Sequence, residues 1–190
     1  MKLKEILAIL KTKYPDIDVE ADAVFVKNCL KNPIQKPTEK IQIYTDGSCH
    51  GNPSEKAGWG VWIPALNKEM YGSANCMSTS NRMELTAMIK ALEWVLADSS
   101  EMPTRVYIIH TDSEYTYNAL TRDIPVWKKK GWKKANRQPV KNLEYMTRLD
   151  GLMGDLLSKR IDYTIRWIKA HSTSADNNHA DALANKGSSA

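Results

Sequence analysis

The chain has 190 residues, of which 42% are hydrophobic and 26% are charged, with 9 Gly and 8 Pro. This composition excludes collagen-like, low-complexity and wholly disordered chains, and the length is that of one ordinary domain with a small appendage. Lys and Arg total 27 against 22 Asp and Glu. The resulting net charge of +5 favours a polyanionic partner without identifying one.

Cysteine usage and the N-terminal residues indicate the compartment. Cys29, Cys49 and Cys76 cannot form a closed set of disulfides, and their spacing matches no metal site. The longest apolar run near the N-terminus, residues 6–10, is too short for a signal sequence or a membrane span. We therefore expect a cytoplasmic protein that does not contact membranes.

The first forty residues differ in character from the rest, because all six tryptophans lie beyond them. Apolar residues at helical spacing over residues 3–10 are followed by a segment, residues 32–39, that proline breaks twice. We predict a helical N-terminal extension over residues 1–40 and a main domain over residues 41–190. The extension carries no chemical motif, and it could be a packing appendage, a docking site for a protein or a nucleic-acid arm.

The main domain begins with a pattern typical of three antiparallel strands. Alternating apolar residues predict a strand over 41–46, and two more strands are expected over 58–63 and 70–74, with a turn at Asn67-Lys68. A helix is expected over 81–97, where Leu85, Ile89, Leu92 and Leu96 form one apolar stripe and Ser80 or Asn81 can cap its first turn.

The second half alternates strands and helices. The continuous apolar run 106–109 predicts a strand buried on both faces in the middle of a sheet. Helices are expected over 114–120 and 143–157, then a strand over 163–168 and a last helix over 177–186. The fold class is therefore α/β.

Four carboxylates occupy unusual places in this outline. Asp46 ends the first strand and Asp112 follows the buried one, so both project from one sheet edge if these strands are parallel neighbours. Glu84, in the first turn of its helix, and Asp181, in the last helix, stand among apolar neighbours. No equally placed Lys or Arg accompanies them, so the four would repel one another unless divalent cations held them. Oxygen ligands favour Mg²⁺ or Mn²⁺ over Zn²⁺.

Each of these residues also has a simpler interpretation when taken alone. Asp46 could belong to a turn, Glu84 could satisfy amides at a helix start, and Asp112 could be an N-cap. Asp181 could pair with Lys186 on a solvated face. His171 could be an ordinary loop histidine.

A basic segment, residues 127–141, contains seven positive charges and no acid. Trp127 and Trp132 alternate with its lysines, so the segment offers both phosphate neutralisation and flat apolar surface for sugars or bases. This pattern predicts contact with nucleic acid. In the alternative interpretation, the tryptophans only anchor the segment to the core.

Five segments together resemble ribonuclease H of type 1, a family that cuts RNA in RNA/DNA hybrids. In order, they are residues 44–53, 81–85, 111–115, 127–142 and 169–184, so the resemblance covers about residues 41–187. It implies the ribonuclease H-like fold, a five-stranded mixed sheet of three antiparallel and then two parallel strands, flanked by helices. It also implies an endonuclease that uses two divalent ions roughly 4 Å apart, Mg²⁺ or Mn²⁺, and leaves 3′-hydroxyl and 5′-phosphate ends.

The resemblance also assigns roles to individual residues. Asp46 would bridge the ions, Asp181 would help to hold the ion that activates water, and Glu84 with Asp112 would hold the ion near the leaving 3′ oxygen. His171 would assist proton transfer or product departure. Substrate contacts are implied for Cys49, Gly51 and Asn52 at the RNA strand, Asn81 at the bases, Thr79 and Asn142 at a DNA phosphate, Asn177 beside the metal site, and Trp127, Lys128, Lys129, Lys130, Trp132 and Lys133 at the DNA strand.

The sequence departs from the family pattern at four positions. Glu114 stands where relatives often have Gln, and Ser80 stands where they often have Asn. Met77 replaces a basic residue of some relatives, and Asp123 stands where an aromatic residue is often found. We therefore keep two alternatives: a noncatalytic hybrid-binding protein on the same scaffold, and another ribonuclease H-like enzyme such as a transposase or junction resolvase. The complete set of carboxylates argues against the first alternative and the basic segment against the second. We expect a monomer whose partner is an RNA/DNA hybrid.

Overall fold

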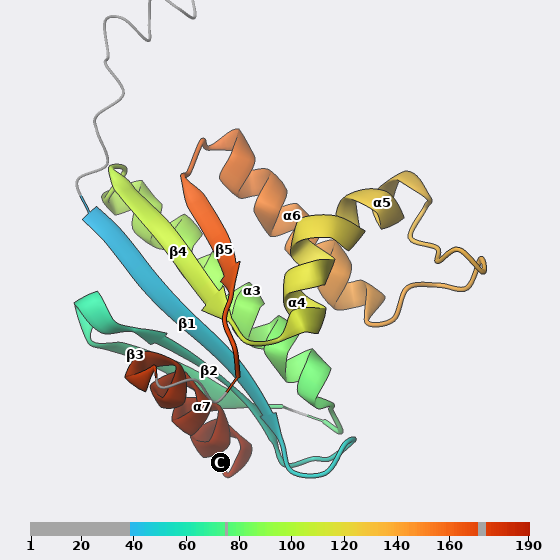
Figure 1. The fold of residues 1–190 in the computed structure, drawn as a ribbon, viewed down its shortest axis with the longest axis horizontal. Helices are drawn as coiled ribbons and strands as arrows, with labels where there is room; N and C mark the ends of the chain where they lie inside the picture. Colours follow the sequence, from blue (N-terminus) through green and yellow to red (C-terminus); the bar gives the residue numbers. More distant parts are fainter. Residues whose placement is uncertain (1–38, 75, 171–173) are drawn as a thin grey trace, which may run out of the picture. The chain divides into compact units, whose positions relative to one another are not determined.

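A computed structural model describes residues 39–74, 76–170 and 174–190. The predicted N-terminal extension over residues 1–40 therefore lies outside the described residues, except for its last two, which begin the first strand. Five strands form one mixed sheet in the order β3-β2-β1-β4-β5 (Figure 1). Their bounds are β1 Glu39–Cys49, β2 Ala57–Ile63, β3 Lys68–Ser73, β4 Arg105–Thr111 and β5 Tyr163–Trp167.

The pairing of the strands confirms the predicted topology. β1, β2 and β3 are antiparallel neighbours, and β4 pairs in parallel with both β1 and β5. The predicted end of the first strand at Asp46 is wrong, because Ser48 and Cys49 continue to pair with β2. The turn after β2 is formed by a 3-10 helix, η1 (Pro64–Leu66), and by Asn67 with φ 46°, while Lys68 already belongs to β3.

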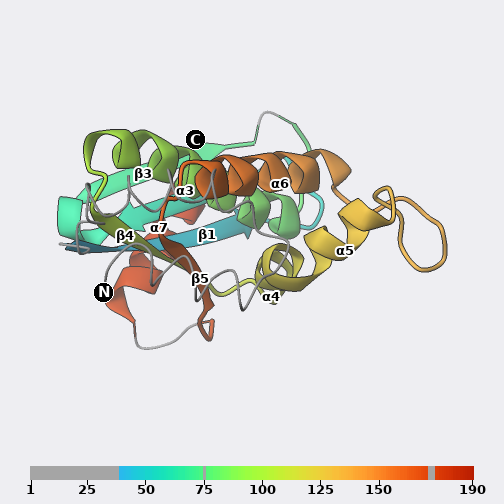
Figure 2. The same cartoon turned by 90° about the horizontal axis from the view of Figure 1, so that it is seen from above.

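Helices cover both faces of the sheet (Figure 2). α3 (Ser80–Glu101) and α6 (Leu143–Ser158) lie on one face, and α7 (Ala175–Ser188) lies on the other. Glycines allow this close packing: for example, a Cβ at Gly47 would lie 2.2 Å from the Glu84 nitrogen in α3, and one at Gly60 would lie 2.4 Å from the Ala180 oxygen in α7. At these positions β1 approaches α3, and β2 approaches α7, more closely than a Cβ atom on the strand would permit.

The main core fills the space between the sheet, α3 and α6. It confirms the predicted apolar stripe at Leu85, Ile89 and Leu92, which are buried, while Leu96 packs at its margin. Other fully buried members are Ile41, Ile43, Met88, Ile109, Met146 and Leu149. Among the described residues, no helix has the length and apolar character needed to cross a membrane.

The helix predicted over 114–120 is the start of a longer helical path. α4 (Glu114–Asn118) leads through a π-helical turn, η2 (Ala119–Asp123), into α5 (Ile124–Lys129). Pro125 lies in the first turn of α5. This path brings the chain to the basic segment.

Candidate active site

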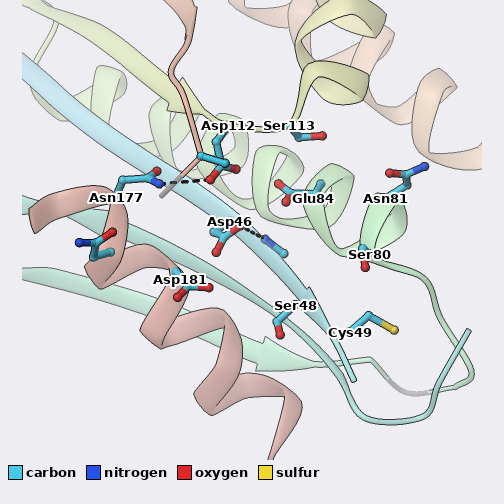
Figure 3. A pocket seen from close by; sticks show the side chains of 13 residues that line it. Asp46, Ser48, Cys49, Ser80, Asn81, Glu84, Asp112, Ser113, Asn177 and Asp181 are labelled. Carbon is cyan, nitrogen blue, oxygen red and sulfur yellow. Dashed lines mark hydrogen bonds between the residues drawn. The ribbon is translucent and has the colours of Figure 1, made fainter. Parts of the chain in front are cut away.

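Three carboxylates meet at the end of the sheet where β4 stops. One oxygen from each of Asp46, Glu84 and Asp112 lies within 4.8 Å of the others (Figure 3). The parallel register sets Thr45 of β1 opposite Thr111 of β4, so Asp46 and Asp112, the next residues, emerge side by side. The predicted convergence of these two residues is therefore confirmed, although Asp46 lies within its strand.

Glu84 reaches this group because α3 lies directly against β1 at Gly47. The helix begins at Ser80 and is capped by the Thr79 hydroxyl, which accepts a hydrogen bond from the Arg82 amide. Both expectations for this helix start are thus corrected: neither Ser80 nor Asn81 is the cap, and Glu84 stands in the second turn, not the first. Glu84 is only 9% exposed, and its Oε2 has no hydrogen-bond partner among the described residues.

α7 supplies two further polar residues from the opposite face. The Asn177 side-chain amide donates to Asp112 Oδ2 at 3.2 Å. Asp181 lies one turn further along α7 and lines the same open pocket, of about 380 Å³, as the other three carboxylates. The structure thus brings all four predicted carboxylates and Asn177 together.

Burial and mutual repulsion disturb the ionisation of these carboxylates. Burial, reinforced by the neighbouring Asp112 charge, raises the pKa of Asp46 from its ordinary 3.8 to about 7. Burial, with the charges of Asp46 and Asp112, raises the pKa of Glu84 well above its ordinary value. The group therefore needs protons or cations to be stable at neutral pH.

The residues present fit a divalent cation. The described residues lining the pocket include no Lys or Arg, and its donors are mainly hard oxygen atoms. The free Oε2 of Glu84 is a buried acceptor for which a cation would be the natural partner. This arrangement can hold metal ions against a negatively charged substrate.

The structure places only some of the residues implied in substrate contact at this pocket. Cys49, Asn81 and Asn177 line it, whereas Gly51 and Asn52 are exposed in the loop that follows β1. Thr79 and Asn142 are linked through Arg82, whose Nε donates to Asn142 Oδ1 at 3.2 Å and whose amide nitrogen donates to Thr79. His171 lies outside the described residues.

The basic segment divides into an anchored part and an exposed part. Trp127 and Trp132 are partly buried and pack against the core, which supports the anchoring alternative for both rings. Lys128 is exposed and forms an ion pair with Asp150 at 2.8 Å. The next basic residues, Lys129, Lys130 and Lys133, are also exposed.

Three residues at the site were missed by the sequence interpretation. The Trp167 indole donates to the Asp112 backbone oxygen at 3.1 Å, a contact with no sequence signal. Asn185 donates to Asp181 and accepts from Ser48. Only Asn185 had a detectable signal, because it follows Asp181 by four residues and therefore lies one helical turn away.

A family model described as RNase H matches residues 38–189. The chain belongs to the RNase H family. Similar members are Ribonuclease H of Paracidovorax citrulli, 45% identical over 150 residues (78% of this chain and 93% of the relative), and Ribonuclease HI of Neisseria meningitidis serogroup B, 40% identical over 151 residues (78% and 95%).

Solved structures agree with this RNase H assignment. A type 1 RNase H with the type 2 active-site motif shares 25% identity and a TM-score of 0.61, covering 80% of this chain and 74% of that one. A foamy viral protease-reverse transcriptase in complex with RNA/DNA hybrid has a TM-score of 0.62 at 23% identity, and the match covers 82% of this chain and 20% of that one. This second similarity concerns the fold, which is the predicted ribonuclease H-like fold.

Proposed function

We propose that this chain is a Mg²⁺-dependent endonuclease that hydrolyses the RNA strand of RNA/DNA hybrids and leaves 3′-hydroxyl and 5′-phosphate ends. The observation that carries the proposal is the convergence of Asp46, Glu84 and Asp112 within 4.8 Å in a pocket whose described lining has no Lys or Arg. Relatives at 40–45% identity named Ribonuclease H or HI support it.

The four carboxylates would bind the ions from different sides. Asp46 stands between Glu84 and Asp112 on one side and Asp181 on the other, which suits a bridging role (Figure 3). Asn177 holds Asp112 by its Oδ2 and thereby limits the rotation of that carboxylate. Bound divalent ions would stabilise the negative charge that develops on the attacking and leaving oxygens of the phosphodiester.

Substrate selection would depend on the shape of the hybrid. The 2′-hydroxyl distinguishes RNA from DNA, and the polar rim of the pocket, including Asn81 and Cys49, is suited to read it. The exposed lysines 129, 130 and 133 would neutralise phosphates of the DNA strand, while Asn142, held by Arg82 and Tyr115, would add a polar contact. His171 would assist proton transfer or product departure.

The test is cleavage of an end-labelled RNA/DNA hybrid beside single-stranded RNA, duplex RNA and duplex DNA. We expect the protein to cut only the RNA strand of the hybrid, in Mg²⁺ and not in chelator. Tight hybrid binding without cutting in either Mg²⁺ or Mn²⁺ would favour the noncatalytic alternative. Cuts in duplex DNA would favour another ribonuclease H-like enzyme.

The metal site should also depend on pH. Metal ligands must be ionised, and the pKa of Asp46 is about 7, so protonation competes with Mg²⁺ as the pH falls below 7. We expect the Mg²⁺ affinity measured by calorimetry to be on the order of tenfold weaker at pH 6 than at pH 8. Equal affinity at the two pH values would contradict a site built on these carboxylates.

A further inference from the structure

Asp181 is attached to a pair of polar residues with no assigned role. The Asn185 side-chain amide donates to Asp181 Oδ1 at 3.1 Å, and the Ser48 hydroxyl donates to Asn185 Oδ1 at 2.5 Å. We infer that Asn185, held in place by Ser48, is a positioning residue that holds Asp181 for cation binding. This inference rests on the proposed function, because it concerns the same metal site.

Asp181 needs such support more than the other carboxylates do. It is not part of the tight group formed by Asp46, Glu84 and Asp112, and it projects from α7 on the opposite face of the sheet (Figure 3). The alternative in which Asp181 pairs with Lys186 is not the contact observed, because the Lys186 ammonium lies over the Tyr71 ring, 4.4 Å from its centre. The Asn185 amide is therefore a local restraint on Asp181.

The Asp181 carboxylate determines which way the Asn185 amide points, because a carboxylate can only accept and therefore selects Nδ2. Asn185 Oδ1 then faces Ser48, whose hydroxyl donates to it and holds the amide in place. Ser48 follows Asp46 by two residues and lies on the same face of β1. The chain Ser48–Asn185–Asp181 thus ties the carboxylate on α7 to the strand that carries Asp46.

An amide is chemically suited to this task. Its N–H occupies one oxygen of Asp181 and leaves the other oxygen for a cation. A Lys or Arg at position 185 would instead place a full positive charge beside the site and oppose the cation. Partners of this kind, which orient a metal-binding carboxylate, typically change metal affinity by 10–100-fold when removed.

The experiment compares Asn185→Ala and Ser48→Ala with the parent chain and with Lys186→Gln. Lys186 is exposed on the same helix and contacts Tyr71, so it serves as the matched control. Two quantities are measured: the Mg²⁺ dissociation constant by calorimetry without substrate, and the Mg²⁺ concentration that gives half-maximal hybrid cleavage. The thermal midpoint in chelator is recorded for every variant.

For Asn185→Ala, we expect both Mg²⁺ quantities to rise about tenfold, with cleavage largely recovered at saturating Mg²⁺. The double variant with Ser48→Ala should be no worse than Asn185→Ala alone, because both substitutions break one chain. A merely structural role would lower the midpoint in chelator and leave the Mg²⁺ quantities unchanged, which would overturn the inference. If the parent chain does not cleave hybrids, the proposed function fails, whereas the calorimetric comparison still decides the role of Asn185.

Discussion

Asp46→Asn is expected to reduce hybrid cleavage by about 10³-fold or more while the protein stays folded. Asn keeps the size of the side chain but removes the negative charge that would bridge the cations, and a thousandfold loss corresponds to about 4 kcal/mol of transition-state stabilisation. Single-turnover cleavage of a labelled hybrid at saturating Mg²⁺ measures the effect. Asp155→Asn, an exposed position on α6, is the matched control and should retain the parent rate.

The same substitution should stabilise the metal-free fold. A carboxyl whose pKa is raised from 3.8 to about 7 contributes stability that is fully present below pH 3.8 and is lost as the pH rises through 7. Asn has no ionisable group, so the variant does not lose this stability as the pH rises. In chelator at pH 8, we therefore expect Asp46→Asn to raise the free energy of unfolding by on the order of 2 kcal/mol, and by less at pH 5.

These two outcomes together test the carboxylate group as a functional site. A residue retained for stability would, when replaced, lower stability and leave chemistry intact. A gain in stability with a loss of cleavage is the opposite pattern, expected where repulsion is maintained for function. Full cleavage by Asp46→Asn would contradict the metal-site assignment.

Gly47→Ala is expected to lower the free energy of unfolding by about 3 kcal/mol, because the new methyl group would overlap backbone that cannot move independently. Its Cβ would lie 2.2 Å from the Glu84 nitrogen and 2.5 Å from the Met83 carbonyl carbon. The strand and α3 must separate to admit it. Since Asp46 is on the strand and Glu84 is on the helix, cleavage should also fall at temperatures where the variant is folded.

Gly151→Ala is the matched control for this prediction. Gly151 lies in α6, and a Cβ there would have no neighbour within 4 Å. Ala is the better helix former, so we expect a gain of roughly 0.5–1 kcal/mol and unchanged cleavage. Denaturant unfolding of both variants measures the contrast. Equal stability of Gly47→Ala and the parent would show that the contact between β1 and α3 can relax.

Much of the sheet could be predicted because its signals are local. Alternating apolar residues mark β1, and the apolar run of β4 marks a buried central strand with His110 and Thr111 also buried. The site carboxylates were found for a related reason. Asp46 and Asp112 follow paired positions of two adjacent parallel strands, so their convergence is a consequence of topology.

Element ends were less predictable than the elements themselves. The end of β1 depends on pairing with β2, which extends the strand to Cys49, and the cap of α3 depends on which hydroxyl reaches the Arg82 amide. In the basic segment, the sequence could not separate binding from packing for Trp127 and Trp132. Their burial against the core distinguishes them from the exposed lysines.

The sequence by itself indicated the family, the order of strands and helices along the chain and the four carboxylates, because motif spacing and hydrophobic period are properties of neighbouring residues. The tertiary structure decided how those carboxylates are held. The donors to Asp112 are Asn177 and Trp167, and Asp181 is tied through Asn185 to Ser48, which is 137 residues from Asn185 along the chain. The contacts of Asn177 and Asn185 exist only after α7 has packed on β1 and β2, where Gly58 and Gly60 leave room for its backbone.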